Sequence, residues 1–141
     1  MKIPKNLRYS LGPLGRILFI IGIVLFAPIL VGIYYSEWAF QAIHLGYIVP
    51  AVSSILLGLI LERKFEVRRL NLVQGLFVTG LSWIIISFFC AIPFLMISDL
   101  GIIDSYFEAV SGFTTTGITM ITNIEILPKS LIFFRSMIQW I

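Results

Sequence analysis

The sequence predicts an all-α integral membrane protein, and its composition and apolar patterning lead to this fold class. Of the 141 residues, 59% are hydrophobic and only 12% are charged, whereas soluble domains contain about 45–50% apolar and about 25% charged residues. The mean hydropathy is +1.03. Three apolar stretches are each long enough to cross a hydrocarbon core of about 30 Å as a helix. The net charge of +3 is small and forms no basic stripe, so nucleic acid is not expected as a partner.

The three apolar stretches are predicted membrane spans that place the chain in the lipid bilayer. They cover residues 14–33, 43–61 and 72–97. Each contains a proline that is expected to kink it, which membrane helices tolerate; these are Pro28, Pro50 and Pro93. Between the second and third spans, residues 62–69 ("ERKFEVRR") are predicted to form a short charged turn.

Basic residues gather on one side of these spans. Eight of the ten Lys and Arg residues lie at or before the start of the first span or between the second and third: Lys2, Lys5, Arg8, Arg16, Arg63, Lys64, Arg68 and Arg69. Positively charged loops stay in the cytoplasm, so we predict a multi-pass protein of the cell inner (plasma) membrane with a cytoplasmic N-terminus. Docking of a cytoplasmic partner is an alternative use of the basic turn. Acids on the other side are suited to attracting cations; these are Glu37, Asp99, Asp104, Glu108 and Glu125.

After the third span the sequence predicts a hairpin that enters the membrane without crossing it. Residues 104–113 are predicted to form a short helix, in which Ser105 and Glu108 fit an S-x-x-E capping box and Asp104 adds a favourable charge at the N-terminus. About ten residues reach only ~15 Å, half of a bilayer. A new apolar helix follows Pro128, so the chain must return.

The returning segment contains the run "TTTGIT", residues 114–119, which is too polar to face lipid. Gly117 and the β-branched residues around it disfavour a helix. Irregular backbone at membrane depth survives only inside protein or beside water, where its carbonyls can replace the hydration shell of a monovalent cation. Gly117 permits the positive φ that points consecutive carbonyls the same way. The predicted ion-binding residues are Thr114, Thr115, Thr116, Gly117, Ile118 and Thr119. A threonine-rich external turn is the alternative, whereas an unpaired strand would leave open edges in the membrane.

One further charge is predicted to lie at membrane depth, in the last apolar helix. Arg135 is costly there unless it faces protein or water, so we expect a buried partner, either an acid or carbonyl groups near residues 114–119; Glu108 is a possible acid. The sequence contains no metal-ligand cluster, nucleophile–base pair or phosphate-binding loop, which argues against an enzyme.

The runs "YFEAVSGFTTTGIT" and "LPKSLIFFRSMIQWI" resemble the Trk/Ktr/HKT superfamily of potassium transporters, and most closely its Trk-type bacterial subunits. The first run is similar to that family's first pore helix and selectivity filter, and the second to the start of the following inner helix. The two preceding spans are similar to the extra helix pair that Trk-type members carry. The resemblance extends over essentially the whole chain.

The resemblance implies a more detailed fold and site. Residues 1–69 would form the N-terminal transmembrane helix pair, and residues 70–141 the first helix–pore-loop–helix repeat with its last helix truncated. Gly117 would be the filter glycine, and potassium would be bound by backbone oxygens of Thr115, Thr116, Gly117 and Ile118. In the family, four non-identical repeats surround one pore. This chain has one pore loop and looks like an N-terminal portion, a fragment or a truncated product, which needs the remaining repeats.

The function implied is potassium uptake, with K⁺ as the transported ion and no cofactor. Two alternatives stay open: a Na⁺-permeable or poorly selective cation transporter, and a small membrane scaffold protein whose threonine-rich segment is only a turn. Family members are typically homodimers that work with a cytoplasmic nucleotide-binding regulatory subunit, so both partners are implied. Coupling of transport to H⁺ or Na⁺, as in a symporter, is not decided by these residues.

Overall fold

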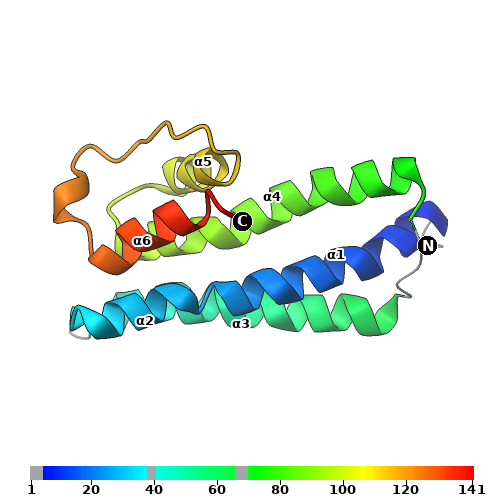
Figure 1. The fold of residues 1–141 in the computed structure, drawn as a ribbon, viewed down its shortest axis with the longest axis horizontal. Coiled ribbons are helices and arrows are strands. Elements are labelled where there is room, and N and C mark those ends of the chain that lie inside the picture. The colour runs from blue at the N-terminus through cyan, green and yellow to red at the C-terminus, as the bar shows by residue number, and fades with distance from the viewer. Residues whose placement is uncertain (1–4, 38–40, 66–69) are drawn as a thin grey trace.

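The computed structural model describes residues 5–37, 41–65 and 70–141, and the regular elements of this part of the chain are helices (Figure 1). In chain order they are α1 (Lys5–Val24), α2 (Ala27–Tyr34), α3 (Gln41–Lys64), α4 (Leu72–Ile97), α5 (Ile102–Phe113), the 3₁₀ helix η2 (Ile124–Ile126) and α6 (Lys129–Met137). Three segments are long and apolar enough to cross a membrane, namely Tyr9–Tyr34, His44–Lys64 and Leu72–Ile97. The predicted all-α membrane fold is confirmed, as is the third span from its first residue to its last.

The first span is interrupted at the position where the sequence contains Pro28. Helix α1 ends at Val24, four residues before this proline, because the pyrrolidine ring would clash with the carbonyl of residue i−4 and supplies no amide hydrogen. Pro28 then occupies the first turn of α2, where its missing N–H costs nothing. In contrast, α3 and α4 continue as helices through Pro50 and Pro93.

The predicted charged turn at residues 62–69 begins too early. Helix α3 continues to Lys64, so Glu62, Arg63 and Lys64 are helical. Positive side chains are favourable at the negative end of a helix dipole, and Arg63 and Lys64 lie in the last turn of α3. Residues 66–69 of the predicted turn lie outside the described residues.

Helix α4 begins with a capping box that the sequence analysis missed. The side chain of Asn71 accepts a hydrogen bond from the Gln74 amide (2.8 Å), and the Gln74 side chain accepts one from the Asn71 amide (3.2 Å). Two of the amide groups at the helix start are thereby satisfied. The chain therefore enters the third span at a fixed residue.

Helices α1 and α3 touch through their backbones. A Cβ atom added to Gly58 would lie 2.6 Å from the Gly15 carbonyl oxygen, and one added to Gly22 would lie 2.9 Å from the Ala51 carbonyl oxygen. Only glycine permits so close an approach, and small residues are the usual contact between membrane helices. The first two spans therefore form a tight helical hairpin.

The N-terminal hairpin and the remainder of the chain share one core. Three buried rings meet there: Phe134 of α6 lies with its ring centroid 5.8 Å from that of Tyr47 in α3 and 5.4 Å from that of Phe94 in α4. Helix α2 also contacts α6. The predicted division between residues 1–69 and 70–141 stays a prediction, and the two parts pack against each other.

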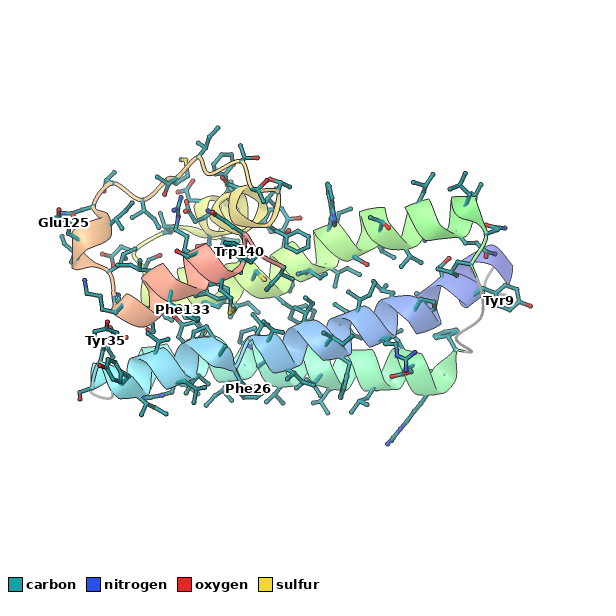
Figure 2. All side chains as sticks on the ribbon, viewed as in Figure 1. Tyr9, Phe26, Tyr35, Glu125, Phe133 and Trp140 are labelled. Carbon is teal, nitrogen blue, oxygen red and sulfur yellow. The ribbon has the colours of Figure 1, made fainter. Side chains whose placement is uncertain are left out.

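Residues 102–141 lie beside one half of the long helices. Figure 1 shows α5 end-on, crossing the direction of α4, with α6 alongside; both lie by the C-terminal half of α4. In Figure 2 the labelled Tyr35 and Glu125 lie at this end of the molecule, and Tyr9 lies at the other. Helices α5 and α6 thus lie beside the same half of α4 (Figure 1), whereas the predicted entry of this hairpin into the membrane stays a prediction.

Candidate functional site

Helix α5 positions the candidate site, and it starts two residues earlier than predicted. Its N-cap is Gly101, in an extended conformation with no side-chain cap, and the Ser105 amide already bonds to the Gly101 carbonyl (2.9 Å). The predicted capping box of Ser105 and Glu108 is therefore wrong, because both residues lie inside the helix and are buried. Asp104 does lie in the first turn, as expected, where its charge favours the positive end of the dipole.

The buried face of α5 is made of small and polar residues, whereas Phe107 is exposed. Glu108, Ala109 and Gly112 follow helical spacing and are buried. A Cβ atom on Gly112 would overlap the Ile138 side chain, which follows α6 directly. The glycine therefore allows the end of α5 to approach the second helix of its own hairpin.

After α5, the backbone amides of residues 114–117 turn back onto its last carbonyls. The Thr115 amide donates to Gly112 O (2.9 Å), and the amides of Thr116 and Gly117 both donate to Ser111 O (3.0 and 3.3 Å). A trans peptide holds its N–H and C=O in opposite directions, and the described residues contain no cis peptide. The carbonyls of Thr114, Thr115 and Thr116 therefore point away from the end of α5.

Two residues with positive φ produce this orientation. Gly117 has φ +78°, as predicted, and Thr115 has φ +58°, which the sequence analysis did not foresee. A β-branched residue rarely adopts such a conformation. Alternation of left- and right-handed residues makes successive amides converge on one acceptor, which here is the Ser111 carbonyl. The unfavourable positive φ at Thr115 is therefore part of the conformation that points the carbonyl oxygens of residues 114–116 away from α5.

The next two carbonyls are already held by side chains. The Ser111 hydroxyl donates to Ile118 O (2.5 Å), and the Arg135 guanidinium donates through Nη2 to Gly117 O (3.3 Å). Each of these oxygens keeps a second lone pair. In contrast, the carbonyls of Thr115 and Thr116 accept no hydrogen bond from residues within the described ranges, and both residues are exposed. Of the four predicted ion-binding carbonyl oxygens, those of Thr115 and Thr116 are therefore free of hydrogen bonds from the described residues, and those of Gly117 and Ile118 each accept one.

The threonine hydroxyls at the two ends of the run have structural partners. Thr114 donates to the Val110 carbonyl (2.7 Å), and its hydroxyl lies 2.9 Å from that of Thr116. The Thr119 hydroxyl lies 3.0 Å from both carboxylate oxygens of Glu108. Thr114 and Thr119, the first and last residues of the run, are therefore both hydrogen-bonded to residues of α5.

Glu108 is the centre of the polar network behind this segment. Its side chain is only 1% exposed. It accepts hydrogen bonds from Arg135 Nε (2.6 Å), from the Thr119 hydroxyl and from the Met120 amide (2.9 Å). The expected buried partner of Arg135 is confirmed, and this arginine contacts both an acid and a carbonyl of the 114–119 segment.

Two residues that matter for this geometry were missed. Ser111 provides the carbonyl and the hydroxyl just described, and Glu37 accepts hydrogen bonds from the Lys129 amide (2.5 Å) and the Ser130 amide (3.2 Å) at the start of α6. The sequence contained a clue to the second, because the Pro128 side chain cannot cap the helix that follows it. The acid that does so comes from the turn after α2, and no local pattern identifies it.

Side-chain clusters suited to a metal ion are absent from the part of the chain that the structure describes, since it holds no group of three or more His, Cys, Asp or Glu residues of that kind. The outward oxygens of residues 114–116 are backbone carbonyl oxygens. Such neutral oxygens suit a weakly held, dehydrated monovalent cation.

Comparison with known proteins connects this geometry to transport. Residues 41–141 match the family model TrkH, described as a cation transport protein. The chain is 38% identical over 138 residues to an uncharacterized cation transporter of Methanocaldococcus jannaschii, covering 97% of this chain and 28% of that protein. It is 28% identical over 138 residues to the Trk system potassium uptake protein TrkH of Halomonas elongata, covering 96% of this chain and 28% of the relative.

A solved structure agrees with these relatives. The potassium transporter TrkH from Vibrio parahaemolyticus superposes with a TM-score of 0.82 at 25% identity, over 95% of this chain and 29% of that one. The chain thus spans little more than a quarter of the length of these relatives. The three candidate membrane spans, the match to a solved structure and the family match agree, and the chain belongs to the TrkH family of cation transport proteins, which are not enzymes.

Proposed function

We propose that this chain contributes one sector of the selectivity filter in a potassium uptake pore. Potassium would be bound by backbone oxygens of Thr115, Thr116, Gly117 and Ile118, with Thr114 and Thr119 at the edges. The observation that supports this most directly is the backbone of residues 114–117, whose amides bond to the end of α5 while the carbonyls point away. The relative from Halomonas elongata is named a potassium uptake protein, which agrees with this ion.

A filter sector needs oxygens that can replace water around an ion and a protein frame that keeps them oriented. Thr115 and Thr116 provide outward oxygens, and Ser111 provides the frame by accepting two amides and holding the Ile118 carbonyl. One backbone segment can contact an ion from one side only. Since residues 115–118 are all exposed, we propose that the remaining pore repeats of the transporter complete the ion sites.

A Na⁺-permeable or poorly selective transporter is the second candidate function, because a single sector does not define the size of the ion site. Membership of a cation transport family disfavours the scaffold alternative. The two transport functions differ in the ratio of K⁺ to Na⁺ uptake.

This ratio also tests the proposed function through Gly117→Ser. A Cβ atom at Gly117 would meet no atom of this chain within 4 Å, yet the residue has φ +78°. The substitution therefore adds backbone strain of about 1 kcal/mol or more and turns a carbonyl. We expect the K⁺ to Na⁺ uptake ratio of the complete transporter to fall severalfold at matched membrane level, since about 1.4 kcal/mol corresponds to tenfold.

Gly80→Ser is the matched control, because Gly80 also has open space around it but lies in helix α4 without a positive φ. It should leave the ratio unchanged. An unchanged ratio in Gly117→Ser, with normal insertion, would show that this segment does not line the ion path.

We also propose that the N-terminus is cytoplasmic, in the inner membrane. Eight of the ten basic residues then lie on the cytoplasmic side. The last turn of α3, which contains Arg63 and Lys64, lies at the same end of the molecule as the start of α1 (Figure 1). A reporter fused after Arg69 should behave as cytoplasmic, and one fused near Leu100 as external. The reverse pattern would place the re-entrant hairpin on the wrong side and contradict the proposal.

We propose the partners of the complete transporter from the resemblance to Trk-type transporters. A homodimer and a cytoplasmic nucleotide-binding regulatory subunit are the expected partners, together with the lipid bilayer. The basic residues at the proposed cytoplasmic end are the part of this chain closest to such a subunit. Coupling of K⁺ movement to H⁺ or Na⁺ would be a property of the complete transporter.

A further inference from the structure

We propose that Glu108 and Arg135 are a charge-balanced pair that determines cation binding at the Gly117 carbonyl. In this view Arg135 positions that carbonyl, and Glu108 neutralises the arginine so that a potassium ion can bind beside it. The inference rests on the proposed function, because it assigns a role to residues around the same filter segment.

The geometry places one guanidinium between two acceptors. Arg135 donates through Nε to Glu108 (2.6 Å) and through Nη2 to Gly117 O (3.3 Å). The planar guanidinium holds its donors in a fixed fork, so its position relative to Glu108 also fixes its position relative to the carbonyl. The three groups come from α5, from the returning segment and from α6.

Glu108 also fixes the chain on the far side of Gly117. Its carboxylate accepts the Thr119 hydroxyl and the Met120 amide. Arginine and glutamate therefore hold the backbone at residue 117 and at residues 119–120. Movement of either side chain would shift the oxygens between these points.

The charges explain why the arginine needs its partner. A cation that uses the second lone pair of Gly117 O would share this oxygen with a guanidinium. Two positive charges so close repel strongly where water is scarce, and the carboxylate at 2.6 Å from Arg135 compensates the fixed one. Loss of the acid and loss of the base should therefore change K⁺ affinity in opposite directions, whereas a pair that served only folding would weaken transport in both variants.

The chain contains a matched control pair. Arg16 Nε lies 3.7 Å from Glu62 Oε1, and these side chains are 64% and 33% exposed. The pair joins α1 to the last turn of α3, at the opposite end of the molecule from the filter segment (Figure 1). Exposed pairs of this kind contribute little, so Arg16→Gln and Glu62→Gln should leave both KM for K⁺ and the K⁺ to Na⁺ uptake ratio unchanged.

The test uses the complete transporter in cells that lack other K⁺ uptake, at matched membrane level. We expect Glu108→Gln to raise KM for K⁺ about tenfold, equivalent to about 1.4 kcal/mol. Arg135→Gln should lower KM for K⁺ and also lower the K⁺ to Na⁺ ratio, because the Gly117 carbonyl is no longer held. Changes of KM in the same direction in both variants, or no change in either, would overturn the proposal.

A second variant decides the matter if a single one fails to insert, since an unpaired buried charge strongly destabilises a protein. The double variant Glu108→Gln/Arg135→Gln has no unpaired charge. We expect it to insert, with KM for K⁺ within about threefold of the parent, a difference below 1 kcal/mol, and with a reduced K⁺ to Na⁺ ratio. Failure of this variant to insert, or an unchanged ratio, would show that the pair serves folding alone.

Gly117→Ser, measured in parallel, separates this inference from the proposed function. A reduced ratio in Gly117→Ser, with unchanged KM and ratio in the pair variants, would remove the inference and leave the filter assignment standing. An unchanged ratio in Gly117→Ser would remove the filter assignment itself, and the inference with it.

Discussion

The hairpin of α1 and α3 and the hairpin of α5 and α6 are held together by different chemistry. In the first, backbones touch at Gly15 and Gly58, and the buried residues around them are mainly aliphatic. In the second, a buried carboxylate, Glu108, receives hydrogen bonds from an arginine, a hydroxyl and an amide. Both regions belong to one chain, in which α1 to α4 contain the three candidate membrane spans.

The difference follows from what each backbone requires. A complete helix satisfies its own amides and carbonyls, and two such helices in lipid associate by close packing rather than by the hydrophobic effect. The returning segment of the second hairpin leaves the helix at Thr114, and each of its polar groups then needs a partner or water. Glu108 and Ser111, which are buried in the adjoining helix α5, supply these partners for the carbonyl of Ile118, the hydroxyl of Thr119 and the amide of Met120. In the first hairpin a buried side chain also contributes, since the Ser54 hydroxyl of α3 donates to the Leu18 carbonyl of α1 (2.8 Å).

The largest effect that tests this comparison is expected from Gly58→Ala. The added Cβ would lie 2.6 Å from Gly15 O and 2.7 Å from the Phe19 amide nitrogen, which are backbone atoms that cannot move aside. Overpacking of this kind costs about 1–3 kcal/mol, so the apparent melting temperature in detergent should fall. Gly80→Ala has open space and should be neutral or stabilising by up to about 1 kcal/mol.

Equal melting temperatures for these two variants would break the comparison. The first hairpin would then not depend on backbone contact, and its packing would resemble that of ordinary apolar helices.

A smaller effect is expected at the contact that joins the two regions. Glu37 follows α2 and accepts the amides of Lys129 and Ser130 at the start of α6. Glu37→Ala removes this cap, which should cost about 1 kcal/mol and should speed hydrogen exchange at those two amides severalfold. Glu125→Ala, at an exposed acid at the same end of the molecule, is the control. Unchanged exchange in Glu37→Ala would mean that water caps α6 equally well.

The smallest effect is expected from Thr119→Ser. The serine keeps the hydroxyl that bonds to Glu108, so the stability should change by about 0.5 kcal/mol or less and the K⁺ to Na⁺ ratio should stay the same. Thr119→Val keeps the shape but removes the hydroxyl, which should cost about 1–3 kcal/mol by leaving a buried acceptor short of a partner. If both substitutions had the same effect on thermal stability, the polar network would not be what holds the second hairpin.

The ends of the helices show where prediction from the local sequence was correct and where it was wrong. The third span was predicted over residues 72–97, the bounds of α4, because an apolar run between polar residues is readable in sequence. The interruption at Pro28 follows from proline's own geometry. The capping box assigned to Ser105 was wrong because the S-x-x-E pattern also occurs inside helices, and Gly101 had already closed the first turn.

The sequence by itself determined the membrane fold, the three spans and the position of the irregular threonine run, because hydropathy, length and backbone preference act between near neighbours. It also indicated that Arg135 needs a buried partner. Only the tertiary structure decided which partner, how the carbonyls are divided between free and held oxygens, and that Glu37 caps a helix 92 residues later. These contacts join segments that are distant in the chain, and a hydrogen bond requires atoms within about 3 Å, a condition that only the packing of helices establishes.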